Sequence, residues 1–87
     1  MKTYNINLNS LYSVRTYISR VSRIPEEVKI DLVSGKNIVD GRSLIAVFSL
    51  NLNQPVQCVV RTSDEEVLTL FEGLLDEYII KSKSDSE

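Results

Sequence analysis

The sequence has no histidine, and Cys58 is the single cysteine among its 87 residues. The absence of histidine excludes phosphohistidine carriers, Ser-His-Asp triads, histidine-ligated zinc and histidine general bases. One cysteine cannot form an internal disulfide or a cysteine metal cluster, so we expect neither a metal nor a cofactor. A lone thiol in a chain without disulfides is typical of a reducing compartment, which predicts a cytoplasmic protein.

Long apolar runs and an excess of positive charge are also missing. The longest unbroken apolar run covers residues 44–48, which is far too short for a membrane-spanning helix. Residues 1–8 alternate apolar and polar side chains, unlike the continuous apolar core of a signal peptide. The 10 basic and 12 acidic residues give a net charge of −2, whereas nucleic-acid-binding domains are usually basic. We therefore expect a soluble protein that binds neither membranes nor nucleic acid.

The apolar pattern of the remaining sequence predicts one small α+β domain. Strands are predicted where apolar and polar residues alternate, near residues 3–9, 28–32, 38–39 and 56–61. Helices are predicted where apolar residues recur every three or four positions, near residues 11–21, 44–50 and 64–79. The order β-α-β-β-α-β-α, with one apolar face per element, predicts an open-faced β-sandwich: a four-stranded, mainly antiparallel sheet with three helices on one face.

Polar residues mark the ends of the predicted helices. Ser10 is expected to cap the first helix, whose apolar stripe begins at Leu11. Ser43 is expected to cap the short helix, and Ser63 with Glu66 has the spacing of a capping box before the last helix.

The boundaries of the domain follow from the same pattern. Gly35 is expected to supply the positive φ of a hairpin turn. The domain is predicted to cover residues 1–81, and residues 82–87, which include no apolar side chain, are predicted to form a disordered tail.

The stretch from Ser34 to Leu50 resembles HPr, the phosphocarrier of the bacterial sugar phosphotransferase system. HPr proteins have a Gly-Lys hairpin, matched by Gly35-Lys36, and a Lys-Ser-Ile/Leu segment opening a short helix that ends Ser-Leu, matched by residues 42–50. An acidic run then opens the last helix, as residues 63–66 do here. The order of elements is similar over residues 2–80, so the resemblance implies the HPr fold.

The chain departs from HPr at the active loop. That loop reads Gly-x-His-x-Arg-Pro in the family, whereas residues 9–14 read Asn-Ser-Leu-Tyr-Ser-Val, with Ser10 close to the position of the missing histidine. Without an imidazole, the chain cannot carry phosphohistidine. It is similar in this respect to the catabolite-repression HPr paralogues, which lack the histidine and keep a regulatory serine. The resemblance therefore implies a degenerate, non-catalytic relative that acts as a regulatory or adaptor protein and is not an enzyme.

Ser43 matches the regulatory serine, which a dedicated kinase phosphorylates in the family. By resemblance, the partner is a protein such as a regulator or the serine kinase of the phosphotransferase system. A phosphate on Ser43 would add about −1.5 to −2 charges at a helix N-terminus, where anions are favoured. Local sequence leaves another interpretation open, in which Ser43 is only an N-cap.

The resemblance also implies a partner-binding patch, formed by Arg42, Leu44, Ile45 and Phe48. Apolar residues surround nearly the whole short helix, so the core cannot accept all of them, and an exposed apolar patch usually marks an interface. Two alternatives stay open at this point. Leu44 and Phe48 can instead belong to the core, leaving Ile45 exposed. The scaffold can also have lost its phosphotransferase function and bind an unrelated protein or small ligand on its open sheet face.

Overall fold

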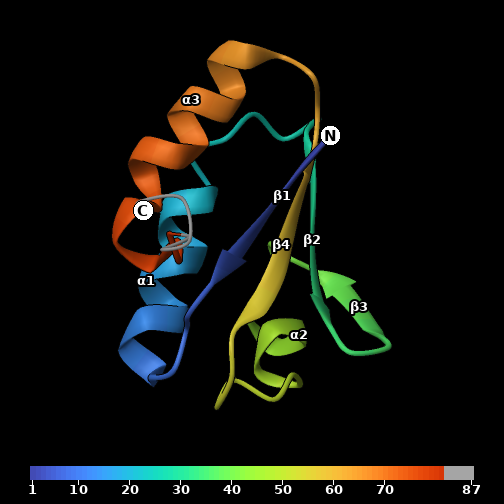
Figure 1. The fold of residues 1–87 in the computed structure, drawn as a ribbon, viewed down its shortest axis with the longest axis vertical. Helices are drawn as coiled ribbons and strands as arrows, with labels where there is room; N and C mark the ends of the chain where they lie inside the picture. Colours follow the sequence, from blue (N-terminus) through green and yellow to red (C-terminus); the bar gives the residue numbers. More distant parts are fainter. Residues whose placement is uncertain (82–87) are drawn as a thin grey trace, which may run out of the picture.

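A computed structural model describes residues 1–81, and the predicted tail, residues 82–87, lies outside the described residues. The elements in chain order are β1 (Lys2–Ile6), α1 (Leu11–Val21), β2 (Lys29–Ser34), β3 (Asn37–Asp40), α2 (Leu44–Phe48), β4 (Val56–Arg61), α3 (Glu65–Leu74) and the 3-10 turn η1 (Asp76–Tyr78). Figure 1 shows the helices gathered on one side of the sheet. Within residues 1–81, no helix combines the length and apolar character needed to cross a bilayer.

The strands of the described range form one four-stranded sheet in the order β1-β4-β2-β3. Every neighbouring pair is antiparallel, and Leu32 in β2 lies opposite both Cys58 of β4 and Val39 of β3. Gly35 closes the β2–β3 hairpin with a φ of +61°, the conformation that the sequence predicts for it. The predicted α+β class and open-faced antiparallel sheet are therefore confirmed.

The core lies between the sheet and the helices, and it is made of alternate strand residues and one stripe from each helix. Each such apolar side chain stabilises the fold by roughly 1.5–3 kcal/mol when it is fully buried. The strand contribution is Tyr4, Ile6, Ile30, Leu32, Val56, Cys58 and Val60, and the helix contribution is Val14, Tyr17, Val21, Val47, Leu68 and Phe71.

Cys58 and Tyr17 meet at the centre of this core. Both side chains are fully buried, and the Tyr17 hydroxyl lies 3.8 Å from the Cys58 sulfur. Burial raises the pKa of the Cys58 thiol to about 12, and burial together with the nearby thiol raises the pKa of Tyr17. The predicted inward position of Cys58 is confirmed.

Two predicted features of the last helix are wrong. Asp64, not Ser63, caps α3, because its carboxylate accepts a 2.9 Å hydrogen bond from the backbone N–H of Glu66. A carboxylate at this position also interacts favourably with the positive end of the helix dipole. The helix ends at Leu74 rather than continuing to residue 79, and the 3-10 turn η1 follows it.

The helical spacing of apolar residues also predicts that Leu11 in α1 and Leu70 in α3 are buried, and both predictions are wrong. Leu11 is 60% exposed and Leu70 is 40% exposed. Val14 and Val21 define the buried side of α1, and Leu11 lies at the edge of that side in the first turn. Leu70 points away from the side of α3 that carries Leu68. A spacing of three or four residues from one apolar neighbour is therefore not enough to place a side chain in the core.

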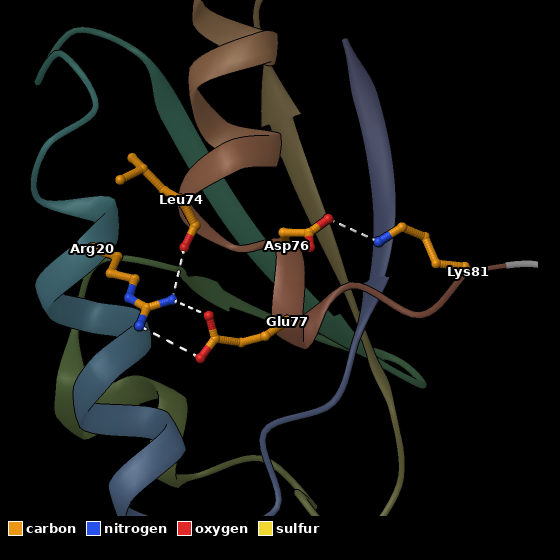
Figure 2. A network of polar contacts seen from close by, with 5 residues as sticks. All are labelled: Arg20, Leu74, Asp76, Glu77 and Lys81. Atoms are coloured by element: carbon orange, nitrogen blue, oxygen red, sulfur yellow. Dashed lines mark hydrogen bonds and ion pairs between the residues drawn. The ribbon is translucent and has the colours of Figure 1, made fainter.

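The segment that follows α3, residues 75–81, forms hydrogen bonds with both α1 and β1. The backbone N–H of Asn7 donates to the carbonyl of Tyr78 at 2.9 Å, and Ile80 donates to Asn5 at 2.8 Å, so the segment pairs with β1 beyond Leu74. Figure 2 shows the Arg20 guanidinium of α1 donating to the Leu74 carbonyl at 3.0 Å and to Glu77 at 2.6 Å. It also shows the Lys81 ammonium 2.9 Å from Asp76.

Candidate functional site

The short helix α2 is held at its start by its own backbone and by Ser43. The Ser43 side chain accepts a 3.2 Å hydrogen bond from the backbone N–H of Ala46, so the hydroxyl caps the helix. Of the side chains in α2, which lies wholly in the described range, only Val47 is buried. Ala46 is half-buried, and the other three side chains of this five-residue helix are exposed.

Three large apolar side chains of α2 form the surface that we call the docking surface: Leu44, Ile45 and Phe48. Their exposed fractions are 38%, 83% and 43%. The interpretation in which Leu44 and Phe48 are core residues does not agree with these values. Full burial of such a side chain is worth roughly 1.5–3 kcal/mol, and much of that free energy is forgone here.

Arg42 immediately precedes the capping serine, but its side chain turns into the fold. The two terminal nitrogens donate to four backbone carbonyls at 2.7–3.3 Å, those of Val21, Ile24, Pro25 and Val28. These carbonyls belong to the last residue of α1 and to the connection that leads into β2. Arg42 is half-buried as a result.

Gly41 lets the chain pass close to the core before α2 begins. A Cβ atom at this position would lie 2.9 Å from both the Tyr17 hydroxyl and the Ile30 side chain. The Gly41 backbone N–H donates to the Ile30 carbonyl at 2.8 Å. Any larger residue would push the base of α2 away from β2, so the close approach requires glycine.

Ser10, which the resemblance to HPr places near the position of the absent histidine, caps α1. The Ser13 backbone N–H donates to the Ser10 hydroxyl at 3.0 Å, and the Ser10 N–H donates to the Ser13 hydroxyl at 3.1 Å. Ser10 and Ser13 therefore form a reciprocal capping box.

A groove of about 780 Å³ runs along α1 from this cap, between Ser10 and Arg20. Leu11 and Tyr12, which line it, are 60% and 76% exposed. The helical spacing places Leu11 in the apolar stripe and predicts no role for Tyr12. Their position in the first turn, directly after the capping serine, is the signal that could have separated them from the buried stripe.

The structure thus brings Arg42, Ser43 and the docking surface together on one continuous segment. Ser10 lies elsewhere, as the N-cap of α1, and α1 packs against α2. No group of three or more acidic, cysteine or histidine side chains within residues 1–81 has a geometry that could hold a metal ion.

The open face of the sheet carries a smaller apolar group. Ile38 of β3 lies directly opposite Val33 of β2 and is 63% exposed. Nearby on the same face, the buried carboxylate of Asp31 accepts a 2.7 Å hydrogen bond from Arg61. The negative charge of Asp31 is therefore paired with Arg61. The exposed apolar area of this face centres on Ile38.

No protein-family model matches this chain, and no curated protein sequence matches it. Among solved structures, the chain is similar to the crystal structure of HPr-C-His from Thermoanaerobacter tengcongensis, with a TM-score of 0.67 and 18% sequence identity. The similarity covers 88% of this chain and 93% of that chain. The HPr-like fold that the sequence predicts is therefore confirmed.

Proposed function

We propose that this chain is a non-catalytic HPr-like regulatory or adaptor protein that binds a protein partner through Leu44, Ile45 and Phe48. The observation that carries the proposal is the exposure of these three adjacent apolar side chains, with Ile45 at 83%. Contiguous exposed apolar side chains are typical of interaction sites. The HPr-like fold supports the proposal, and the lack of histidine leaves surface contact as the means of action, since phosphohistidine cannot form.

A phosphate on Ser43 would act as the switch for this contact. Ser43 directly precedes the docking surface, and its hydroxyl points at the backbone N–H of Ala46. Phosphorylation would place about two negative charges beside Leu44 and Ile45, which would repel an acidic partner and attract a basic one. By resemblance, the partner is a regulator or a serine kinase of the phosphotransferase system in a bacterial cytoplasm.

A second candidate function uses the open sheet face. It is favoured by the 63% exposure of Ile38 and by its position opposite Val33. In this case the scaffold has lost its phosphotransferase role and binds an unrelated protein or small ligand there. The two candidates use different elements, so substitutions separate them.

The experiment is a comparison of immobilised variants in native lysate. Ile45→Asp and Phe48→Ser alter the docking surface, and Ile38→Asp is the matched control on the sheet face. We expect the first two variants to lose a protein that wild type and Ile38→Asp retain. Loss with Ile38→Asp alone would favour the second candidate. Equal capture by all variants would contradict both.

The Ser43 switch needs its own variants. Treatment with a serine kinase and ATP is expected to label wild type and to leave Ser43→Ala unlabelled. Ser43→Asp is expected to change capture of the same protein in the direction that phosphorylation changes it. Label on Ser43→Ala would contradict the switch. Equal capture of the partner by phosphorylated and unphosphorylated protein would also contradict it.

A further inference from the structure

The Arg42 side chain connects the start of α2 to the end of α1 and to the loop between α1 and β2. Its Nη1 donates to the carbonyls of Val21 and Ile24 at 3.0 and 3.3 Å, and its Nη2 donates to those of Pro25 and Val28 at 2.7 and 2.8 Å. The guanidinium thus lies across the end of α1 and the loop that leads into β2.

The acceptors suit a cation. Carbonyls at a helix C-terminus carry the negative end of the helix dipole, and a carbonyl oxygen can accept two hydrogen bonds. The Val21 and Pro25 carbonyls already accept from the backbone N–H groups of Ile24 and Val28 at 3.0 Å, so Arg42 supplies their second donor. Val21 is the last residue of α1, and Ile24 follows it within one turn. The planar fork of a guanidinium can donate to several carbonyls at once, whereas a lysine ammonium is a compact point charge without this geometry.

The other end of Arg42 is equally constrained. Its backbone N–H donates to the Asp40 carboxylate at 2.9 Å, and the preceding Gly41 packs against Tyr17 and Ile30. Both the backbone and the side chain of Arg42 are therefore held by hydrogen bonds, two residues before α2 begins.

The helix that Arg42 precedes has little else to fix its orientation. Val47 is the buried side chain within α2, and Leu50 is buried just after it. One buried residue in a five-residue helix leaves rotation and fraying of the helix weakly opposed. A restraint at the N-terminal end of α2 therefore has a large effect on the orientation of Ile45 and Phe48.

We propose that Arg42 is a positioning residue, which clamps α2 to the end of α1 and so holds the docking surface in its binding orientation, rather than a residue that contacts the partner. This proposal rests on the function proposed above, in which the docking surface binds a protein partner. A partner carboxylate could reach the terminal nitrogens of Arg42 only by displacing the carbonyls of Val21 to Val28.

The clamp can be tested in the wild-type protein by NMR of arginine side chains. Hydrogen bonds from both terminal nitrogens should slow rotation of the guanidinium, so Arg42 should give separate Nη–H signals that exchange slowly with solvent. The exposed Arg15 and Arg23 are the matched controls, and their signals should be averaged. Averaged signals from Arg42 would overturn the clamp without any question of whether a variant folds.

The effect on α2 is tested by amide hydrogen exchange of Arg42→Lys, with Arg23→Lys as the control. We expect exchange at Val47 and Leu50 to become about tenfold faster or more in Arg42→Lys, as for the loss of a charged hydrogen bond, while the β4 amides change little. Equal acceleration in α2 and β4 would reduce Arg42 to a general stabilising residue, and unchanged α2 exchange would also overturn the proposal. Neither measurement needs the partner. Failure of the proposed docking function would be detected by a different experiment, in which Ile45→Asp captures the same proteins as wild type.

Discussion

The Tyr4 hydroxyl donates a 2.7 Å hydrogen bond to the Glu72 carboxylate and thereby joins β1 to α3. The Lys2 ammonium reaches the same carboxylate oxygen at 3.0 Å. The hydrogen bond from Tyr4, followed by that from Lys2, lowers the pKa of Glu72 below its ordinary value. Burial and the bond to Glu72 raise the pKa of Tyr4, so the phenol stays protonated and remains the donor.

This pair predicts a loss of stability in acid. A lowered pKa in the folded state means that Glu72 stabilises the fold above its unfolded-state pKa, near 4.5, and that this contribution disappears as the pH falls through the folded value. We expect Glu72→Gln to be less stable than wild type at pH 7 in urea unfolding, with the difference shrinking below pH 4.5. Glu26→Gln, in an exposed loop, is the control. A difference that persists unchanged at about pH 2 would contradict this origin.

The buried Cys58 predicts slow thiol chemistry and alkaline sensitivity. Its folded-state pKa of about 12 is above that of an unfolded thiol, so the stabilising effect is complete below the unfolded value and is lost as the pH rises toward 12. An aromatic disulfide reagent at pH 8 should modify Cys58 far more slowly in native protein than in urea. Equal rates in the two states would show that the thiol is accessible.

Gly41→Ala should destabilise the fold by about 1–3 kcal/mol, the usual range for an overpacked site. The added Cβ would lie 2.9 Å from Tyr17 and Ile30. Gly73→Ala is the matched control, because nothing lies within 4 Å of its added Cβ and alanine is the better helix former by about 1 kcal/mol. Urea unfolding should therefore move in opposite directions for the two variants. Similar urea midpoints for the two variants would show that Gly41 does not lie this close to Tyr17 and Ile30 in solution.

Ser10→Ala should lower stability by about 1 kcal/mol, because an N-cap is lost at the start of α1. If Ser10 acts as a cap and not as a substitute for the missing histidine, partner capture through α2 should be unchanged. Incubation with phosphoenolpyruvate and the first enzyme of the phosphotransferase system should not label either protein. Label on wild type that is absent from Ser10→Ala would identify Ser10 as a phosphoacceptor instead.

Much of the fold could be predicted because its determinants are local. The alternation around Ile6 and Leu32 sets the buried face of each strand, and Ser10 and Ser43 cap helices as their neighbours predict. The exact ends of a helix depend on small differences in free energy. At the start of α3, Asp64 rather than Ser63 is the cap, and its carboxylate interacts favourably with the helix dipole.

The hydrogen bonds of the Arg42 side chain could not be predicted in the same way. The four carbonyls that accept from Arg42 belong to residues 14 to 21 positions earlier in the sequence. Every residue has a backbone carbonyl, so the residue types do not indicate which carbonyls accept. The resemblance to HPr placed Arg42 in the partner-binding patch, with Leu44, Ile45 and Phe48. Leu11 was assigned to the core for a related reason, since spacing alone does not reveal which first-turn side chains the sheet covers.

The most direct test of the account is an NMR titration of labelled protein with the partner that wild type captures and Ile45→Asp does not. We predict that the amide signals of Leu44, Ile45 and Phe48 and the methyl signals of Leu44 and Ile45 shift on binding, while the amide and methyl signals of Val33 and Ile38 stay in place. Shifts confined to Val33 and Ile38 would contradict the account and assign binding to the open sheet face.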